Sequence, residues 1–466
     1  MSSSARDRGV LAALLTLAVL VTSGCSYVVI GEARSQGMPT ESVDDGTLTV
    51  VGATDGPIDT LARNALADLE TYWSATFPDV YGQAFQPLTG GYFSVDPNDV
   101  DPSLYPEGIG CGTDPRELEN NAFYCSAQGA PNSDSISYDR AFLGELAAEY
   151  GEVLPQLVMA HEFGHAVQGR VGYPEASIAT ETQADCLAGA WTAWVAEGNG
   201  DYATIDTADL DQLLRGYFLL RDPVGTGTGE QQAHGSYFDR VSAFQEGFDD
   251  GPTACRDNYG PGRVFTQGEF TSDEDFASGG NAPFTDTTET ILPNSLSEFW
   301  GRAFTEVLDA EFTEPQLDST SGAPDCAADA VALVYCADGG DGAGLVAYDT
   351  GFAEQAYDEF GDYAVVTGVA IPYALAAREQ LGLSTDDTEA LQSAVCLTGW
   401  YSAQVYNGEL ESVTISPGDI DESVQFLLTY GNDPDVLADV ELTGFQLVDL
   451  FRAGFLNGAE PCDVGV

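Results

Sequence analysis

The chain of 466 residues contains no lysine and only three histidines. Its 15 basic residues are all arginine and stand against 75 acidic residues, which gives a formal net charge of −60. A chain this acidic repels phosphate, so nucleic acid is excluded as an expected partner. Most of the acidic residues are expected on a solvated surface. Because histidine is so scarce, two histidines at a regular spacing are unusually informative.

After its first residues the sequence also lacks any apolar run long enough to cross a bilayer. Residues 1–25 are typical of an export signal, in which two arginines precede an apolar run from Val10 to Val21. The segment Thr22-Ser23-Gly24-Cys25 resembles a bacterial lipoprotein signal, whose cysteine carries the lipid. We therefore expect an exported protein tethered by Cys25 to the outer face of the membrane; a secreted protein with an ordinary cleaved signal is the alternative. The polar residues 26–56 are predicted to be a flexible tether.

One short motif carries most of the recognisable chemistry. Residues 161–165 read His-Glu-Phe-Gly-His and lie in a segment with helical apolar spacing. On a helix this spacing puts His161 and His165 on one face, four residues apart, where both can bind a single zinc ion. Glu162 then lies beside the open position of the metal, where a general base is needed. A pair of idle surface histidines is the alternative.

A catalytic zinc ion takes three protein ligands and leaves a fourth position open. The next predicted helix, from about Ser177 to Glu197, offers Glu181 as the third ligand. Asp185 lies one turn further on the same face, and we expect its carboxylate to accept the free N–H of His161 and so to fix the ring's tautomer. Glu181 as a solvated acid at the start of a helix is the alternative interpretation.

These residues resemble the bacterial neutral zinc metallopeptidases, a family of the Glu-zincin type. The resemblance covers about residues 111–255. It is carried by Phe123-Tyr124-Cys125, by the histidine motif with Gln168, by Glu181 with Gln183-Ala184-Asp185-Cys186, and by His234-Gly235-Ser236 with Arg240, Phe244 and Gly247.

The resemblance implies a helix-rich α+β zincin fold and hydrolysis of peptides. It also implies that His161, His165 and Glu181 bind one zinc ion per chain and that Glu162 is the base. His234 either donates a hydrogen bond to the oxyanion or replaces Glu181 as a ligand, with an idle surface histidine as a third interpretation. Arg240 orients a carboxylate or the segment around His234, or forms a structural ion pair.

The second half of the chain repeats features of the first half. Tyr138-Asp139 recurs as Tyr348-Asp349, and Ala184, Cys186, Leu187 and Gly189 recur as Ala394, Cys396, Leu397 and Gly399, all 210 residues later. Collinear repeats at one shift predict a tandem duplication of one domain. We expect a metallopeptidase domain over 57–255, a linker rich in Gly, Asp, Thr and Pro over 256–293, and a second copy over 294–466.

The second copy is expected to lack the metal site. At the same shift, five residues of the second copy stand opposite the expected zinc ligands, the base and Asp185 of the first copy. All five are apolar or proline: Ile371, Pro372, Leu375, Leu391 and Val395. Beyond Cys25, eight cysteines remain, four in each half, and an even number in an exported chain predicts disulfides. Matching halves should form matching bonds, Cys111–Cys125 with Cys326–Cys336, and Cys186–Cys255 with Cys396–Cys462. Symmetry alone leaves three ways to join four cysteines, and the short loops favour the close pairs.

Two classes of function remain open at this stage. The first is a membrane-tethered zinc peptidase that acts on a peptide or protein substrate. The second is a lipoprotein for binding or envelope assembly that holds zinc without catalysis. Two histidines and one carboxylate beside a glutamate favour the first class, because structural zinc sites usually fill all four positions with Cys and His.

Overall fold

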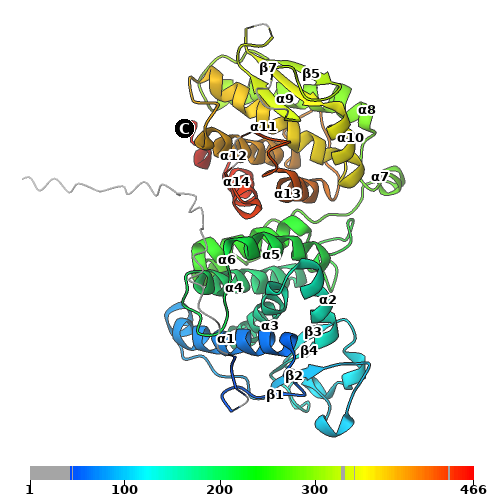
Figure 1. The fold of residues 1–466 in the computed structure, drawn as a ribbon, viewed down its shortest axis with the longest axis vertical. Helices are drawn as coiled ribbons and strands as arrows, with labels where there is room; N and C mark the ends of the chain where they lie inside the picture. The colour runs from blue at the N-terminus through cyan, green and yellow to red at the C-terminus, as the bar shows by residue number, and fades with distance from the viewer. Residues whose placement is uncertain (1–41, 45, 327–330, 341, 439–440, 466) are drawn as a thin grey trace, which may run out of the picture.

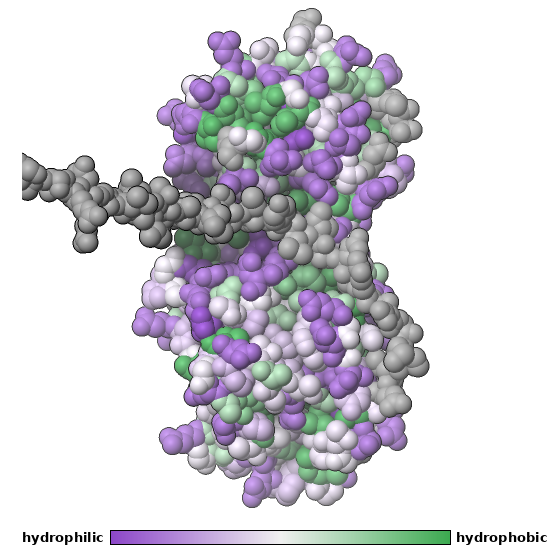
Figure 2. All heavy atoms as spheres, turned by 90° about the vertical axis from the view of Figure 1, so that its left-hand side faces the viewer, coloured by the Kyte–Doolittle hydropathy of each residue, from purple (hydrophilic) through white to green (hydrophobic). Residues whose placement is uncertain are grey.

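The computed structural model describes residues 42–465 apart from 45, 327–330, 341 and 439–440. The fold is α+β and rich in helix, and the chain forms two lobes that follow one another along the long axis (Figure 1). Figure 2 shows hydrophilic side chains spread over both lobes and a narrower waist between them. No helix of the described residues is both long enough and apolar enough to span a membrane.

The first lobe combines a small sheet with a group of packed helices. Its elements are β1 (Val50–Val51), α1 (Pro57–Tyr81), β2 (Gly91–Val95), β3 (Ala122–Cys125), β4 (Ser135–Asp139), α2 (Arg140–Tyr150), α3 (Val153–Val171), α4 (Ser177–Ala196), α5 (Thr207–Leu220) and α6 (Tyr237–Asp257). The strand order is β1-β2-β4-β3, with β3 antiparallel to β4 and the other pairs parallel. The strand β3 therefore forms one edge of the sheet, next to α3.

The second lobe has the same kind of parts in the same order. It contains β5 (Gln316–Thr320), β6 (Leu333–Cys336), β7 (Leu345–Asp349), α10 (Thr350–Glu359), α11 (Asp362–Gln380), α12 (Thr388–Tyr406), α13 (Asp419–Tyr430) and α14 (Gly444–Asn457). The strand β7 lies between a parallel partner, β5, and an antiparallel edge strand, β6. This arrangement matches that of β4 between β2 and β3.

The helices α4 and α6 cross at very short range, because glycines lie where they meet. A Cβ atom on Gly189 would lie 2.0 Å from the carbonyl oxygen of Phe244, and one on Gly247 would lie 1.7 Å from that of Cys186. Any larger residue would push these helices apart. The helices α12 and α14 meet through Gly399 and Gly454 in the same way.

Two aspartates join the lobes reciprocally. Asp211 of α5 accepts the backbone N–H groups of Gly444 and Phe445 at the start of α14, at 3.1 and 2.7 Å. Asp421 of α13 accepts those of residues 237–238 at the start of α6, at 3.1 and 2.9 Å. Each carboxylate satisfies free N–H groups at a helix N-terminus and lies favourably in its dipole.

The structure can be compared with the predicted signal, tether and linker. The predicted signal (residues 1–25) and Cys25 lie outside the described residues. The later part of the predicted tether (26–56) is packed rather than free, because the apolar Val43 and Val50 are buried and β1 pairs with β2. Within the predicted linker (256–293), α6 continues to Asp257, and two short helices follow, α7 (Asp273–Ser278) and α8 (Phe284–Asp286). The helix α9 (Leu292–Glu306) begins immediately before the predicted second copy.

Four disulfides tie the lobes internally. They join Cys111 to Cys125, Cys186 to Cys255, Cys326 to Cys336 and Cys396 to Cys462. Two of them link the close helix pairs, Cys186–Cys255 between α4 and α6, and Cys396–Cys462 between α12 and the turn after α14. The other two hold the edge strands β3 and β6 to the preceding loops. Each lobe thus has one bond near its sheet and one among its helices.

Candidate metal centre

The site lies where α3 and α4 pack against one another, and each helix contributes ligands by its own regular spacing. His161 and His165 are one turn apart on α3 and present 13% and 14% of their side chains to solvent. Gly164 lies between them, and a Cβ atom there would lie 2.9 Å from the backbone of Ala184 on α4. This glycine lets the two helices approach until Glu181 faces both histidines.

Three donor atoms converge at a spacing that suits zinc. Glu181 Oε2 lies 3.4 Å from His161 Nε2 and 3.5 Å from His165 Nε2. Ligands about 2.1 Å from a tetrahedral zinc ion lie about 3.4 Å from each other. The donor set of two imidazoles and one carboxylate, all within 4.8 Å of one another, therefore fits zinc and leaves its fourth position to water or substrate.

The other nitrogen of each histidine faces an acceptor, which leaves both Nε2 atoms free for a metal. His161 Nδ1 lies 2.7 Å from Asp185 Oδ1, and His165 Nδ1 lies 2.8 Å from Gln168 Oε1. The amide group of Gln168 donates to Thr180 O at 2.7 Å and to a neighbouring glutamine at 3.0 Å, so its oxygen is the atom that faces the ring. Such contacts fix the tautomer and the orientation of ligand imidazoles.

Asp185 is itself held by Arg240 of α6. The guanidinium donates from Nε to Asp185 Oδ2 at 2.8 Å and from Nη2 to Asp185 Oδ1 at 2.9 Å. Asp185 is fully buried and Arg240 is 3% exposed, so the pair forms a desolvated two-pronged contact. Burial alone would raise the pKa of Asp185, but Arg240 and His161 hold it below its usual value. The carboxylate thus stays charged behind His161.

Charges and burial shift the other groups of the site in a consistent way. Burial alone would lower the pKa of His161, but the nearby Asp185 carboxylate raises it to about 10. The pKa of Glu181 is lowered, since hydrogen bonds from both histidines outweigh its burial. Burial raises the pKa of Glu162. In the metal-free site the carboxylates thus favour a proton on both histidines, whose pKa values are raised, and a bound metal would displace these protons. Glu162 is the carboxylate most inclined to take up a proton.

Glu162 lies on the wall of the cleft beside the edge strand of the sheet. Its Oε2 accepts the backbone N–H of Tyr124 in β3 at 2.7 Å. Since this N–H points to Glu162, it points away from β4, towards the free side of β3. The same cleft is lined by Ala122, Phe123 and Tyr124, so the edge strand and the candidate zinc ligands face a common space.

His234 lies in this cleft but apart from the three-donor cluster. Its Nδ1 lies 3.1 Å from Asp222 Oδ1, and its backbone N–H donates to Asp222 Oδ2 at 2.6 Å. The side chain is 46% exposed. The structure thus places Glu181, and not His234, with the two histidines of α3.

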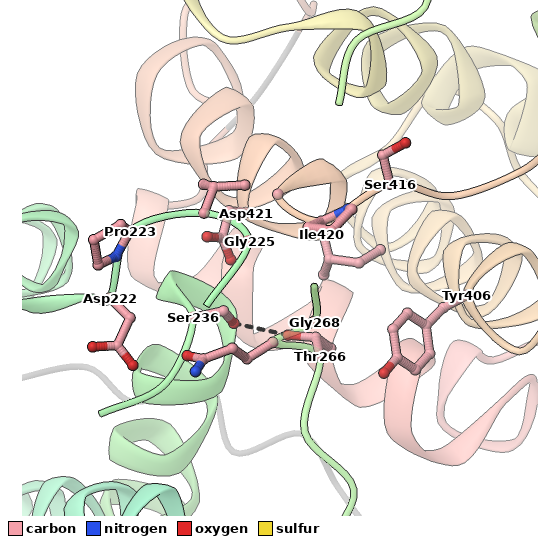
Figure 3. A pocket seen from close by; sticks show the side chains of 14 residues that line it. Asp222, Pro223, Gly225, Ser236, Thr266, Gly268, Tyr406, Ser416, Ile420 and Asp421 are labelled. Carbon is pink, nitrogen blue, oxygen red and sulfur yellow. Dashed lines mark hydrogen bonds between the residues drawn. The ribbon is translucent and has the colours of Figure 1, made fainter. Parts of the chain in front are cut away.

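A second pocket lies at the contact between the lobes, with Asp222 and Ser236 on one side and Tyr406 and Asp421 on the other (Figure 3).

Two contacts of the site were not predicted from the sequence. Gln168 stands three residues after His165, a separation at which helical side chains meet, so its role could have been read from spacing. The hydrogen bond from Tyr124 to Glu162 has no such signal, because the strand and the helix are 38 residues apart and meet only through the packing of α3 on the sheet.

Comparison with known proteins agrees with this geometry. Residues 1–259 match the family model described as "Putative neutral zinc metallopeptidase". The chain is 28% identical to the uncharacterized protein YpfJ of Escherichia coli K12 over 211 residues, which are 40% of this chain and 69% of that protein. It is 28% identical to the uncharacterized protein Rv2575 of Mycobacterium tuberculosis over 176 residues, 32% of this chain and 58% of that protein. No solved structure matches the chain.

Proposed function

Because the chain belongs to the putative neutral zinc metallopeptidase family, we propose that it hydrolyses peptide bonds in the cleft between α3, α4 and β3. One observation carries the proposal: a carboxylate oxygen lies at the tetrahedral spacing of zinc ligands from two imidazole nitrogens, beside a buried glutamate. His161, His165 and Glu181 would hold one zinc ion. Structural zinc sites usually have four protein ligands, and this set has three.

When bound, zinc lowers the pKa of a coordinated water to about 7 and polarises the scissile carbonyl. Glu162 accepts the proton of the attacking water and later passes it to the leaving amine. Its raised pKa suits both steps, because a carboxylate of higher pKa accepts a proton more readily. The Tyr124 N–H fixes one of its oxygens and so holds the side chain in the cleft.

The remaining groups orient the reactants. Asp185, held by Arg240, keeps His161 in the tautomer that offers Nε2, and Gln168 does the same for His165. We assign His234 to the oxyanion as a hydrogen-bond donor, with Asp222 fixing its ring. The edge strand β3 lines the cleft, and an extended peptide could pair with its free side. This feature favours peptides over compact amides as substrates.

The direct test compares the wild-type protein with Glu162→Gln. Both should contain one zinc ion per chain by elemental mass spectrometry, because Glu162 is not a ligand. Only the wild type should cleave casein or a random peptide library. Equal cleavage by the two proteins would refute the role of Glu162. If both proteins hold zinc and neither cleaves any peptide, the peptidase proposal fails, which favours the alternative of a binding or assembly lipoprotein.

We further propose that the second lobe is a degenerate copy of the first. The matching strand orders, the glycine contacts of α4/α6 and α12/α14, and the reciprocal caps Asp211 and Asp421 support this interpretation. The two caps give the contact between the lobes an approximate twofold character, as in a dimer of like domains. The pocket at the position of the metal site is lined by Pro372, Leu375 and Leu391, which cannot bind zinc.

Export and a membrane tether through Cys25 complete the proposed function. They rest on the signal-like residues 1–25, since an apolar run ends in a cysteine preceded by small residues. Metabolic labelling with a radioactive fatty acid tests the tether. The wild type should incorporate label, and Cys25→Ala should not.

A further inference from the structure

Three buried carboxylates meet in the second lobe, far from the candidate zinc ligands in the sequence. Asp362 is the first residue of α11, and Asp419 and Glu422 lie in the first turn of α13. They are 7%, 3% and 6% exposed, and one oxygen from each lies within 4.8 Å of the other two. Buried acids in such proximity repel one another and need a compensating positive charge or protons.

The protein neutralises this cluster only in part. Glu422 Oε2 accepts the backbone N–H of Tyr363 at 2.8 Å, and Asp419 Oδ2 accepts that of Ser416 at 2.7 Å. Among the described residues, Asp362 Oδ1 and Asp419 Oδ1 are buried without any hydrogen-bond partner. Burial and the charges of the other two acids raise the pKa of Glu422 well above its usual value. Two oxygens of the cluster therefore still lack a partner.

A neutral oxygen lies beside the cluster. Asn281, in the segment before α8, has its amide oxygen next to Gly361, where it accepts the backbone N–H of Asp362 at 3.3 Å. A carboxylate oxygen of Glu422 lies next to the same glycine. A Cβ atom on Gly361 would lie 2.1 Å from Glu422 Oε1 and 2.4 Å from Asn281 Oδ1. Gly361 has φ +129°, a conformation that other residues rarely adopt. The backbone thus leaves space for these two oxygens to lie close together.

From this geometry we propose that Asp362, Asp419 and Glu422, with Asn281, bind a calcium ion. Calcium takes about six to eight oxygen ligands in a flexible geometry, whereas magnesium demands a near-ideal octahedron, dehydrates reluctantly and usually keeps several waters. The cluster is buried and offers oxygens that belong to the protein itself, one from each acid within 4.8 Å of the other two. It therefore suits the ion that gives up its water more readily. Three carboxylates and an amide oxygen are ligands that calcium prefers.

The first lobe provides an internal comparison. Gly151, 210 residues before Gly361, has φ +109°, and a Cβ atom there would lie 1.8 Å from Gln212 Oε1. Gln212 thus stands where the second lobe has Glu422, and an amide replaces the acid. Glu152 and Asp209 are the counterparts of Asp362 and Asp419 at the same shift of 210 residues. Glu152 is exposed, and Asp209 is only partly buried. The same backbone arrangement therefore forms without three buried acids, so their presence in the second lobe requires an explanation beyond the fold.

Calcium here would join the segment before α8 to the N-termini of α11 and α13. Asp421, between Asp419 and Glu422 in sequence, caps α6 of the first lobe and forms an ion pair with Arg221 at 2.7 Å. Figure 3 shows Asp421 facing the pocket between the lobes. The ion would therefore stabilise the end of α13 that contacts the first lobe.

The test measures calcium bound by the zinc-loaded protein. Equilibrium dialysis with radioactive calcium, in excess magnesium to cover the acidic surface, should show one fewer calcium ion per chain for Glu422→Gln than for the wild type. Asp419→Asn should show the same loss. The matched control is Asp209→Asn, which changes the counterpart acid in the first lobe and should bind calcium like the wild type.

Thermal unfolding provides a second readout on the same proteins. The Tm of the wild type and of Asp209→Asn should rise steadily with the logarithm of the calcium concentration, whereas magnesium should have little effect. The Tm of Glu422→Gln should not respond to calcium. Equal calcium stoichiometry in the wild type and Glu422→Gln would overturn the proposal, and so would a wild-type Tm that calcium and magnesium raise equally or not at all.

Discussion

Replacing Asp185 by asparagine tests the buried contact behind the candidate metal centre. Asp185 accepts three hydrogen bonds, one from His161 and two from Arg240. Asparagine has the same shape, but its NH2 group replaces one acceptor oxygen. If the amide oxygen stays with His161, it also keeps the contact with Arg240 Nη2, and the NH2 group faces the Nε–H donor of Arg240. The arginine then remains buried at 3% exposure without a counter-charge.

Two losses of different size follow from this geometry. Removing one partner of a buried ion pair costs about 3–5 kcal/mol, so the metal-free variant should unfold at a clearly lower urea concentration. A lost contact behind a ligand histidine weakens metal binding by about 10–100-fold. Competition with a zinc chelator of known affinity measures the second loss, and urea unfolding followed by circular dichroism measures the first.

Asp421→Asn is the matched control for this experiment. Asp421 is also buried and also paired with an arginine, Arg221 at 2.7 Å, but it lies in the second lobe. It should lose stability and keep wild-type zinc affinity. Wild-type zinc affinity in Asp185→Asn would refute the positioning role of Asp185, and unchanged urea unfolding would refute the energetic weight given to its pair with Arg240.

Three further predictions concern the same lobe. Gln168→Ala removes the acceptor at His165 Nδ1 and should weaken zinc binding by about tenfold in the chelator assay. Because Gln168 is buried and its amide also donates to Thr180 and Gln183, the free energy of unfolding should fall by about 1–3 kcal/mol in the urea assay. Gly247→Ala brings a methyl group onto the carbonyl of Cys186 and should lower the free energy of unfolding by about 1–3 kcal/mol. Gly301→Ala, at an open helical position, is the control and should be neutral or stabilising. Equal effects of the two substitutions would contradict the close crossing of α4 and α6. Removing zinc with phenanthroline should abolish hydrolysis and leave the far-ultraviolet circular dichroism unchanged, because disulfides and helix packing hold the site; unfolding would instead indicate a structural zinc ion.

The α+β class, the helix-rich character and the family were predictable from the sequence, and the structure and the family match confirm them. The helix that carries the motif was foreseen because apolar residues recur at helical spacing and glycine ends it. The packed start of the fold at Val43 and Val50 was missed, since short apolar stretches among polar residues resemble a tether. The segment β1 forms a strand only because it pairs with β2, which the sequence around it does not indicate.

By itself the sequence determined what depends on local geometry. Helical spacing puts His161 and His165 on one face of α3, and it puts Glu181 and Asp185 on one face of α4. Both results follow from the period of the helix alone. Tertiary structure decided every contact between distant segments. Arg240 reaches Asp185 across 55 residues, and the buried acids Asp362, Asp419 and Glu422 meet only because α11 and α13 begin side by side. Such contacts depend on how helices pack, and no short-range periodicity encodes them.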